Sequence, residues 1–221
     1  MRTMPRLAAM TLTAAVAMAA NAAAPDLTVT VDGVRAGKPI PQEQALCTPT
    51  ADGKSDKVKQ ILRPTIGWSG APAGTASFAV FMMDPDVPAD FTDAGKEGKT
   101  LPKDSKRQDF FHYGIVNIPA SATQLAGGDA TKAPPAGSEL PNDLGANGYV
   151  KPAHAYGGPC PPWNDERRHN YHFIVLALDA DAPKTKPRET AKDAFNRLIG
   201  SKHVLAKGAT IGTYTLNPSL K

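Results

Sequence analysis

Two aspartates at the end of a long apolar run are the first feature of the chain that could do chemistry. Asp84 and Asp86 close the run in FAVFMMDPDVPADF, residues 78–91. Because successive side chains of an extended chain point to opposite faces, both carboxylates point the same way if the strand continues through them. Like charges this close repel unless water surrounds them or another group lies between them. An Asx-type turn at a strand end is the simpler explanation of the pair.

Two histidines occupy similar positions beside other apolar runs. His112 is near the start of FFHYGIVNIPA, and His169 opens HNYHFIVLALD. By alternation, His169 and Tyr171 share one face of a strand, while His172 points to the other. These groups, together with the aspartates, could hydrogen-bond a phosphate or carboxylate, or hold a metal ion for hydrolysis. The alternatives are that His112 is a hydrogen-bonded core histidine and that His169 belongs to a solvated turn.

The elements that must position these side chains are mainly strands. Short apolar runs are separated by Gly, Pro, Asn and Asp, and runs that are apolar on both faces fit the interior of a packed sandwich. Near the C-terminus, Thr190 is a candidate helix N-cap and Gly200 a stop, and residues 201–208 could add a short turn. We therefore expect a mainly β (α+β) fold, a two-sheet antiparallel β-sandwich with a few short helices. The expected strands are residues 27–31, 64–68, 77–83, 110–118, 171–179 and 212–216.

Two long connections interrupt this pattern. Residues 89–109 are charged and contain glycine, and residues 119–168 are rich in Pro, Gly and Asn. Connections of this length inside a compact domain are usually functional or disordered. No internal repeat or low-complexity linker divides the chain, so residues 25–221 are predicted to form a single domain.

The first residues predict a secretory signal peptide. Arg2 and Arg6 precede an alanine-rich apolar stretch with several Ala-x-Ala sites, which indicates removal of residues 1–24. The stretch is too weakly apolar to favour the alternative, a membrane anchor. We expect a periplasmic or secreted protein with no integral membrane segment after signal cleavage.

Charge and cysteine content narrow the classes further. The full chain has 25 basic and 21 acidic residues, and loss of the two leader arginines lowers the net charge from +4 to 23 − 21 = +2. Without a basic stripe or patch, nucleic acid is not an expected partner. Cys47 and Cys160 are the only cysteines. In an exported protein they suggest one disulfide, and two buried free thiols are the alternative.

Three ordered motifs resemble the phosphatidylethanolamine-binding protein family, which includes the Raf kinase inhibitor proteins. The motifs are DPDVP, HYGIVNIP and GGPCPP…HNYHFIVLALD, and the similarity to the bacterial branch extends over about residues 47–214. The resemblance implies a β-sandwich with a small anion pocket at one end. The residues that fall on the family's pocket motifs are Asp84, Asp86, His112, Gly158, Pro161, Pro162, His169 and Tyr171. Two departures are Asn170, where the family commonly has Arg, and Tyr113, where it often has Trp.

The resemblance favours a binding protein for a small anionic ligand, such as a phosphate or a phospholipid headgroup. In this interpretation the imidazoles, the Tyr171 hydroxyl and the N–H groups of Gly157 and Gly158 donate to the anion. The aspartates orient the imidazoles and keep them charged. We expect no cofactor, no metal and no catalytic residue, since no Gly-x-Ser-x-Gly motif is present.

Two other functions stay open from the sequence. Aspartate and histidine could serve a phosphoester hydrolase, with or without a metal. The protein could also inhibit or modulate a protein partner through residues 89–109, although mixed charges of this kind are more often a solvated loop.

Overall fold

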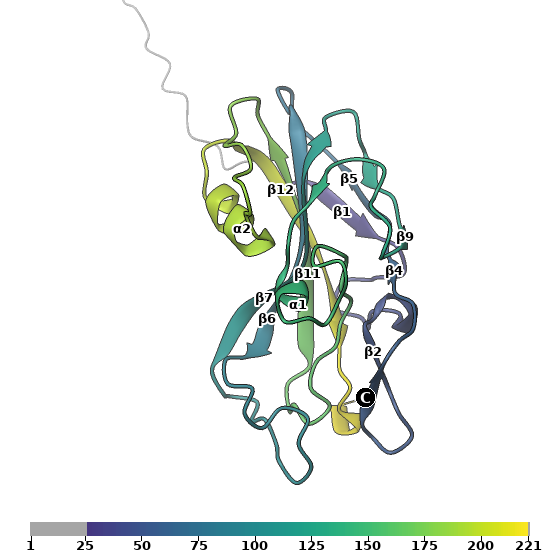
Figure 1. Ribbon diagram of the computed structural model, residues 1–221. Coiled ribbons are helices and arrows are strands. Elements are labelled where there is room, and N and C mark those ends of the chain that lie inside the picture. Colours follow the sequence, from purple (N-terminus) through teal and green to yellow (C-terminus); the bar gives the residue numbers. More distant parts are fainter. Residues whose placement is uncertain (1–25, 221) are drawn as a thin grey trace, which may run out of the picture.

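A five-stranded antiparallel sheet forms the centre of the molecule. The computed structural model of the protein describes residues 26–220. The predicted signal peptide therefore lies outside the described residues. The strand order is β10-β7-β6-β11-β12. The strands β6, β7, β11 and β12 run nearly the length of the molecule (Figure 1), whereas β10 is short. Their bounds are Ser77–Pro88 (β6), Arg107–Pro119 (β7), Ser138–Glu139 (β10), His169–Leu178 (β11) and Val204–Tyr214 (β12).

A smaller sheet packs on one face of the central sheet and completes the sandwich. Its order is β1-β5-β8, with β1 at Thr28–Val31, β5 at Ile66–Ser69 and β8 at Gln124–Leu125. Two short ribbons lie beside it: β2 (Cys47–Pro49) pairs with β3 (Ser55–Lys57), and β4 (Leu62–Arg63) pairs with β9 (Gly128–Asp129). The mostly β sandwich predicted from the sequence is confirmed.

Burial on both faces explains why β6 has no polar alternation. Phe78, Val80 and Met82 face the sandwich core, whereas Ala79 and Phe81 belong to a second apolar cluster on the opposite face. Apolar side chains on both faces of a strand are stable only if both are covered. The apolar run in the sequence therefore indicates a strand in the middle layer of three.

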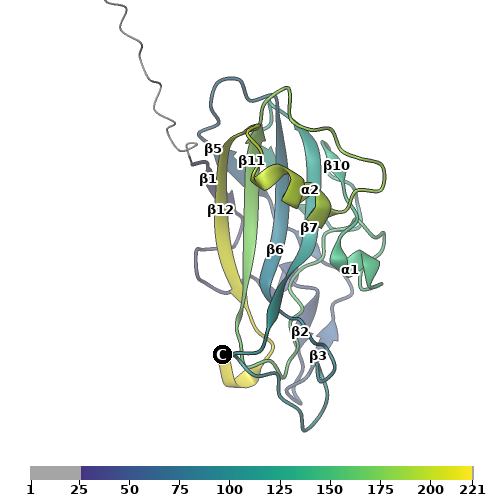
Figure 2. The ribbon, with the colours of Figure 1, turned by 90° about the vertical axis from the view of Figure 1, so that its left-hand side faces the viewer.

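Helix α2 (Ala191–Ile199) supplies the third layer and lies across the central sheet (Figure 2). Thr190 caps it as predicted: its hydroxyl oxygen accepts from the Asp193 N–H, and the Asp193 carboxylate accepts from Thr190 in return. The helix approaches β7 closely at Gly114, where any Cβ would collide with Ala191. The remaining helical segments are α1 (Asp143–Ala146) and two 3₁₀ turns, η1 (Gln42–Gln44) and η2 (Pro218–Leu220).

Most predicted strands exist with shifted ends. The short turn predicted within residues 201–208 is present just before Val204, whose N–H donates to the Ser201 carbonyl. The last strand starts earlier than predicted, because β12 already begins at Val204 and pairs with β11 along its length. Glycine at 208 allows the close approach of the Leu27 carbonyl, which a side chain would block. Within residues 26–220, no helix has the length and apolar character needed to cross a membrane.

The two long connections contain structure. β6 continues to Pro88 and β7 starts at Arg107, so the charged loop spans residues 89–106. Three short strands and α1 lie within residues 119–168. The chain between Tyr149 and His169 then runs past the end of the central sheet, where the polar motifs of the sequence meet.

Candidate functional site

A pocket of about 570 Å³ lies at the end of β6 and β11 and contains most of the predicted site. Its walls come from the strand ends, the loop 89–106, the segments 144–149 and 160–163, and Ser55 of the β2–β3 ribbon. Of the predicted residues, it is lined by Asp84, His112, Pro161, Pro162, His169 and Tyr171. Apolar and aromatic side chains form most of the remaining wall: Val87, Phe91, Phe110, Leu144, Tyr149 and Trp163.

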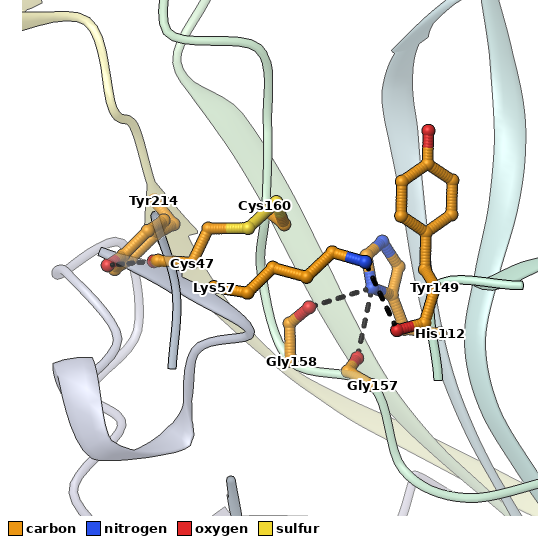
Figure 3. Close-up of a disulfide and its surroundings, with 8 residues drawn as sticks. All are labelled: Cys47, Lys57, His112, Tyr149, Gly157, Gly158, Cys160 and Tyr214. Carbon is orange, nitrogen blue, oxygen red and sulfur yellow. Dashed lines mark hydrogen bonds between the residues drawn. A yellow bond between two sulfur atoms is a disulfide. The ribbon is translucent and has the colours of Figure 1, made fainter. Parts of the chain in front are cut away.

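His112 is fixed by the backbone of the glycine-proline loop. Its Nδ1 lies 3.0 Å from the Gly157 carbonyl oxygen and 3.2 Å from that of Gly158 (Figure 3). Carbonyl oxygens only accept hydrogen bonds, so Nδ1 carries a proton and donates it. In the neutral imidazole, Nε2 is then an acceptor.

Burial sets the charge of His112. Its side chain is only 3% exposed. This burial lowers the pKa of the imidazole below its usual range, against the raising effect of the nearby Asp84 carboxylate. His112 is therefore neutral near pH 7, which corrects the expectation that both pocket histidines are kept charged.

Two buried polar atoms at the pocket have no partner. Within residues 26–220, neither Nε2 of His112 nor the hydroxyl of Tyr171 makes a hydrogen bond. The two rings contact each other edge to face, with centroids 5.2 Å apart. Burial raises the pKa of Tyr171 well above its ordinary value, and Asp84 raises it further. An unpartnered buried polar group is costly, so a polar ligand group that hydrogen-bonds to these two atoms would recover free energy.

His169 has the opposite state. Its Nδ1 donates to Asp84 Oδ2 at 2.7 Å, and its Nε2 donates to Asp165 Oδ2 at 3.1 Å. Burial alone would lower the pKa of His169, but the hydrogen bonds to Asp165 and Asp84 outweigh burial and raise the pKa to about 9. His169 is thus a charged imidazolium whose two N–H groups are both occupied, and it has none left for a ligand.

Asp84 combines the two explanations that the sequence offered. Its Oδ1 accepts the backbone N–H of Asp86 at 2.8 Å, which is an Asx-type turn. Its Oδ2 accepts from His169. One carboxylate therefore ends the strand and orients the imidazole.

Asp86 does not orient a histidine, so this part of the predicted role is wrong. The side chain accepts from the Asn170 backbone N–H and side-chain amide, at 2.9 and 2.8 Å, and from Arg167 Nη1 at 3.1 Å. These hydrogen bonds outweigh burial and lower the pKa of Asp86. Asp86 is absent from the pocket lining within the described chain. It instead fixes the strand that carries His169, and Asn170 is its partner.

Gly158 also acts from behind the pocket wall. Its carbonyl accepts from His112, and a side chain at this position would collide with the Gln44 carbonyl. The sequence predicts that the N–H groups of Gly157 and Gly158 donate to a ligand. For Gly157 this prediction is wrong, because its N–H donates to the His112 carbonyl at 3.1 Å. The loop thus supplies acceptors for the imidazole.

The predicted disulfide is present between Cys47 and Cys160, whose Cα atoms are 4.8 Å apart. It joins β2 to the pocket loop two residues beyond Gly158 (Figure 3). The Leu46 and Cys47 N–H groups both donate to the Pro159 carbonyl. Cys160 itself lines the pocket. The pocket wall is therefore covalently tied to the β2–β3 ribbon.

The sequence analysis missed Asp165 and Asn164. Asp165 accepts from His169 and forms an ion pair with Arg107, at 2.6 Å between Nη1 and Oδ2. The Asn164 amide donates to the Asp93 and Lys99 carbonyls and accepts from the Gly95 N–H. Asp165 stands four residues before His169, a spacing that a search for carboxylates near each histidine would have found. Nothing in the sequence pairs Asn164 with a loop 65 residues away.

The charged loop 89–106 is part of the site. Phe91, Ala94 and Gly95 line the pocket, and Leu101 is buried. Glu97 forms an ion pair with Lys54, which lies next to the pocket residue Ser55 in the β2–β3 ribbon. The loop and the ribbon therefore meet beside the pocket.

The pocket has little positive charge available to a ligand. Among residues 26–220, no lysine or arginine lines it. In the same range, no three His, Cys, Asp or Glu side chains are arranged to hold a metal ion. The cavity is lined mainly by aromatic and apolar side chains. Its polar groups are the Tyr171 hydroxyl and the His112 imidazole acceptor, together with the neutral side chains of Ser55, Asn147, Tyr149 and Trp163.

A β-sandwich with a part-apolar pocket and a few convergent polar groups defines a small-ligand-binding class of protein. The family model described as phosphatidylethanolamine-binding protein matches residues 30–215. The chain therefore belongs to the phosphatidylethanolamine-binding protein family, as the motifs predicted.

Bacterial relatives support the same assignment. The chain is 36% identical to the UPF0098 protein YbcL of Escherichia coli K12 over 141 residues, which is 62% of this chain and 61% of that protein. It is 32% identical to a UPF0098 protein of Aquifex aeolicus over 170 residues, 75% of this chain and 77% of the relative. The alignment to YbcL thus leaves more than a third of that relative unmatched.

Two solved structures share the fold. The crystal structure of E. coli YbcL, described as a new member of the mammalian PEBP family, superposes with a TM-score of 0.61 and 25% identity, covering 86% of this chain and 98% of that one. A putative homologue from Chlamydia trachomatis gives 0.58 at 22% identity, covering 86% and 97%.

Proposed function

We propose that this protein binds a small ligand that has an acidic, phosphate-type group and an apolar body. The observation that carries the proposal is the pair of unpartnered buried atoms, His112 Nε2 and the Tyr171 hydroxyl. An acidic group accepts from the hydroxyl and shares a proton with the imidazole nitrogen, while the aromatic wall buries the ligand's apolar part. The family's name points to a phospholipid headgroup, and a soluble phosphate ester has the same chemistry.

We also propose that the protein works outside the cytoplasm, in the periplasm or as a secreted protein. Residues 1–24 have the composition of a signal peptide. The Cys47–Cys160 disulfide is of a kind that persists in oxidising compartments.

We propose binding without turnover. Both nitrogens of His169 are held by carboxylates, so this histidine has no free nitrogen to act as a general base. His112 Nε2 is free, and it is therefore the group that a test for turnover must address. Both cysteines are in the disulfide, so neither is a thiol nucleophile. A phosphatase assay with and without EDTA tests this point, and turnover lost in His112→Ala would favour the hydrolase instead.

Action on a protein partner is a second candidate. Phe91 is 46% exposed at the pocket wall, on the charged loop 89–106. A bound ligand and a protein surface would then meet at the same place. Deletion of the loop tip should abolish capture of such a partner.

The ligand proposal is tested by isothermal titration with two probes that share one apolar body, phenylphosphonate and benzylamine. Phenylphosphonate should bind and benzylamine should not. Tyr171→Phe should weaken phenylphosphonate binding about tenfold, because it removes the donor to the acidic group. His203→Gln is the matched control. His203 hydrogen-bonds Asp179 beyond the opposite end of β11, so this change should leave binding unchanged. Selective binding of benzylamine would refute an acidic ligand.

If phenylphosphonate binds, two further probes separate the two sources of the headgroup, a lipid and a soluble ester. Lysophosphatidylethanolamine and glycerophosphoethanolamine carry the same phosphodiester headgroup, with and without an acyl chain. Tighter binding of the lipid indicates that the apolar wall receives the chain, whereas equal binding indicates a soluble ester.

A further inference from the structure

The hydrogen-bond pattern of His112 restricts how the pocket can accept an acid, and this inference rests on the proposed function. We infer that the ligand binds together with one proton, shared between an acidic oxygen of the ligand and Nε2 of His112. At pH values where both partners are deprotonated, binding takes this proton from solvent. The pocket is thereby a site for a protonated acid, and affinity depends on pH.

The first support is the fixed direction of the imidazole. Nδ1 donates to two carbonyl oxygens, from Gly157 and Gly158, so the proton of the neutral ring is on Nδ1. The other tautomer would place an unprotonated nitrogen against two acceptors, and rotating the ring would place a carbon there, so either change would leave both carbonyls unpaired. Nε2 therefore faces the ligand as a lone pair and repels an oxygen that carries no hydrogen.

The second support is the lack of another charge that could replace the proton. Within residues 26–220, no lysine or arginine lines the pocket. The positive charge of His169 is already directed to Asp84 and Asp165, at 2.7 and 3.1 Å. An unprotonated anion would thus meet the Nε2 lone pair and the Asp84 carboxylate beside the Tyr171 hydroxyl, with no lysine or arginine of residues 26–220 to balance its charge. The other polar side chains of the lining, Ser55, Asn147, Tyr149 and Trp163, are neutral.

The groups around His112 agree with this proton balance. From β6 the ring is faced by the Asp84 carboxylate, and from β11 by the Tyr171 hydroxyl and the charged His169. Asp84 favours a proton on His112, whereas burial and His169 oppose it. An incoming acidic oxygen adds the second negative charge and so favours the shared proton.

A buffer acid gives up a proton, so its bond to that proton breaks and its conjugate base remains in solution. The proton joins the ligand and His112, where one O–H···N or O···H–N hydrogen bond forms at Nε2. An acid that is already singly protonated brings the proton itself. Phosphate and phosphonate monoanions can do this, whereas a sulfonate, which carries no hydrogen, must take its proton through His112.

The test is titration calorimetry of the full chain with phenylphosphonate, in buffers of different ionisation enthalpy. The number of protons taken up should be close to one at pH 8.5 and should fall toward zero at pH 5.5, where the probe carries the proton. Benzenesulfonate is the matched probe. At pH 5.5 it should bind at least tenfold more weakly than phenylphosphonate, and its binding should still take up a proton.

Two variants locate the proton. His112→Gln keeps an amide donor near the position of Nε2 but cannot titrate, so affinity for benzenesulfonate should become independent of pH between 5.5 and 8.5. Tyr171→Phe should bind about tenfold more weakly but retain the uptake. Thermal unfolding of each variant establishes that it is folded at the titration temperature.

The outcomes separate this inference from the proposed function. Binding of phenylphosphonate at pH 8.5 without proton uptake, or uptake that persists unchanged in His112→Gln, would overturn the inference and leave an acid-binding pocket. Absence of phenylphosphonate binding at both pH values would overturn the proposed function itself.

Discussion

At the scale of single residues, the two pocket histidines have opposite protonation states because their partners differ. His112 faces two carbonyl oxygens and is neutral, whereas His169 lies between two carboxylates and is charged. Both are deeply buried, so burial alone does not distinguish them. The identity of the hydrogen-bond acceptor decides the charge of each ring.

The charge of His169 makes stability depend on pH. Its pKa is about 9 in the folded state and near 6.5 when unfolded, so its contribution is fully present below pH 6.5 and is lost as pH rises through 9. The free energy of unfolding should fall by about 3 kcal/mol over this interval. Urea unfolding of wild type and His169→Gln at pH 6 and pH 9.5 measures it. A wild-type value that does not change with pH would contradict the ion-paired imidazolium.

His112 acts in the opposite direction and in another pH range. Because its pKa is lowered on folding, its contribution is present above the unfolded pKa and is lost as pH falls below about 6.5. The two histidines therefore limit the stability of the fold from both sides of neutral pH.

At the scale of elements, the pocket depends on one covalent link. The Cys47–Cys160 disulfide holds the loop whose Gly157 and Gly158 carbonyls orient His112. The double variant Cys47→Ser, Cys160→Ser should lose about 4 kcal/mol of unfolding free energy, because the bond closes a long loop. It should also bind phenylphosphonate more weakly, because the loop carbonyls are then less fixed.

Urea unfolding and titration calorimetry check this pair of effects. Reduced wild type serves as the control, since it loses the bond without a change of sequence. A variant that unfolds more easily but binds with unchanged affinity would show that the loop is held by its backbone hydrogen bonds alone.

The elements also show how far the sequence could predict the site. Alternation placed His169 and Tyr171 on the pocket face, and the N-cap signal at Thr190 located α2 to within one residue. Strand ends were less predictable: β12 starts eight residues earlier than expected because pairing with β11 overrides local turn signals. Register shifts, such as the bulge between Asp84 and Val87, follow from tertiary packing.

Roles were harder to predict than positions. Asp84 and Asp86 lie two residues apart on the same strand, yet of the two only Asp84 contacts an imidazole. The difference comes from Asn170 and Arg167, which approach Asp86 from a strand more than eighty residues away in the chain. No local pattern carries that information.

At the scale of the whole molecule, three layers place the site at an end of the sheet. The smaller sheet covers one face of the central sheet and α2 covers the other (Figure 2). The strand ends are where polar groups can meet a cavity without disturbing either apolar layer. The loop 89–106 and the β2–β3 ribbon then extend beyond the sheet and form the pocket walls.

The disulfide also has a mechanical consequence. Its two cysteines are 113 residues apart, so the strands β3 to β10 lie inside a covalent ring. When the chain is pulled from its two ends, the ring cannot extend, and the central strands β6 and β7 carry no load once the outer segments have unravelled. Force spectroscopy should give a final contour length about 40 nm shorter for the oxidised chain than for the reduced chain. Equal lengths in the two states would mean that the bond does not close this ring.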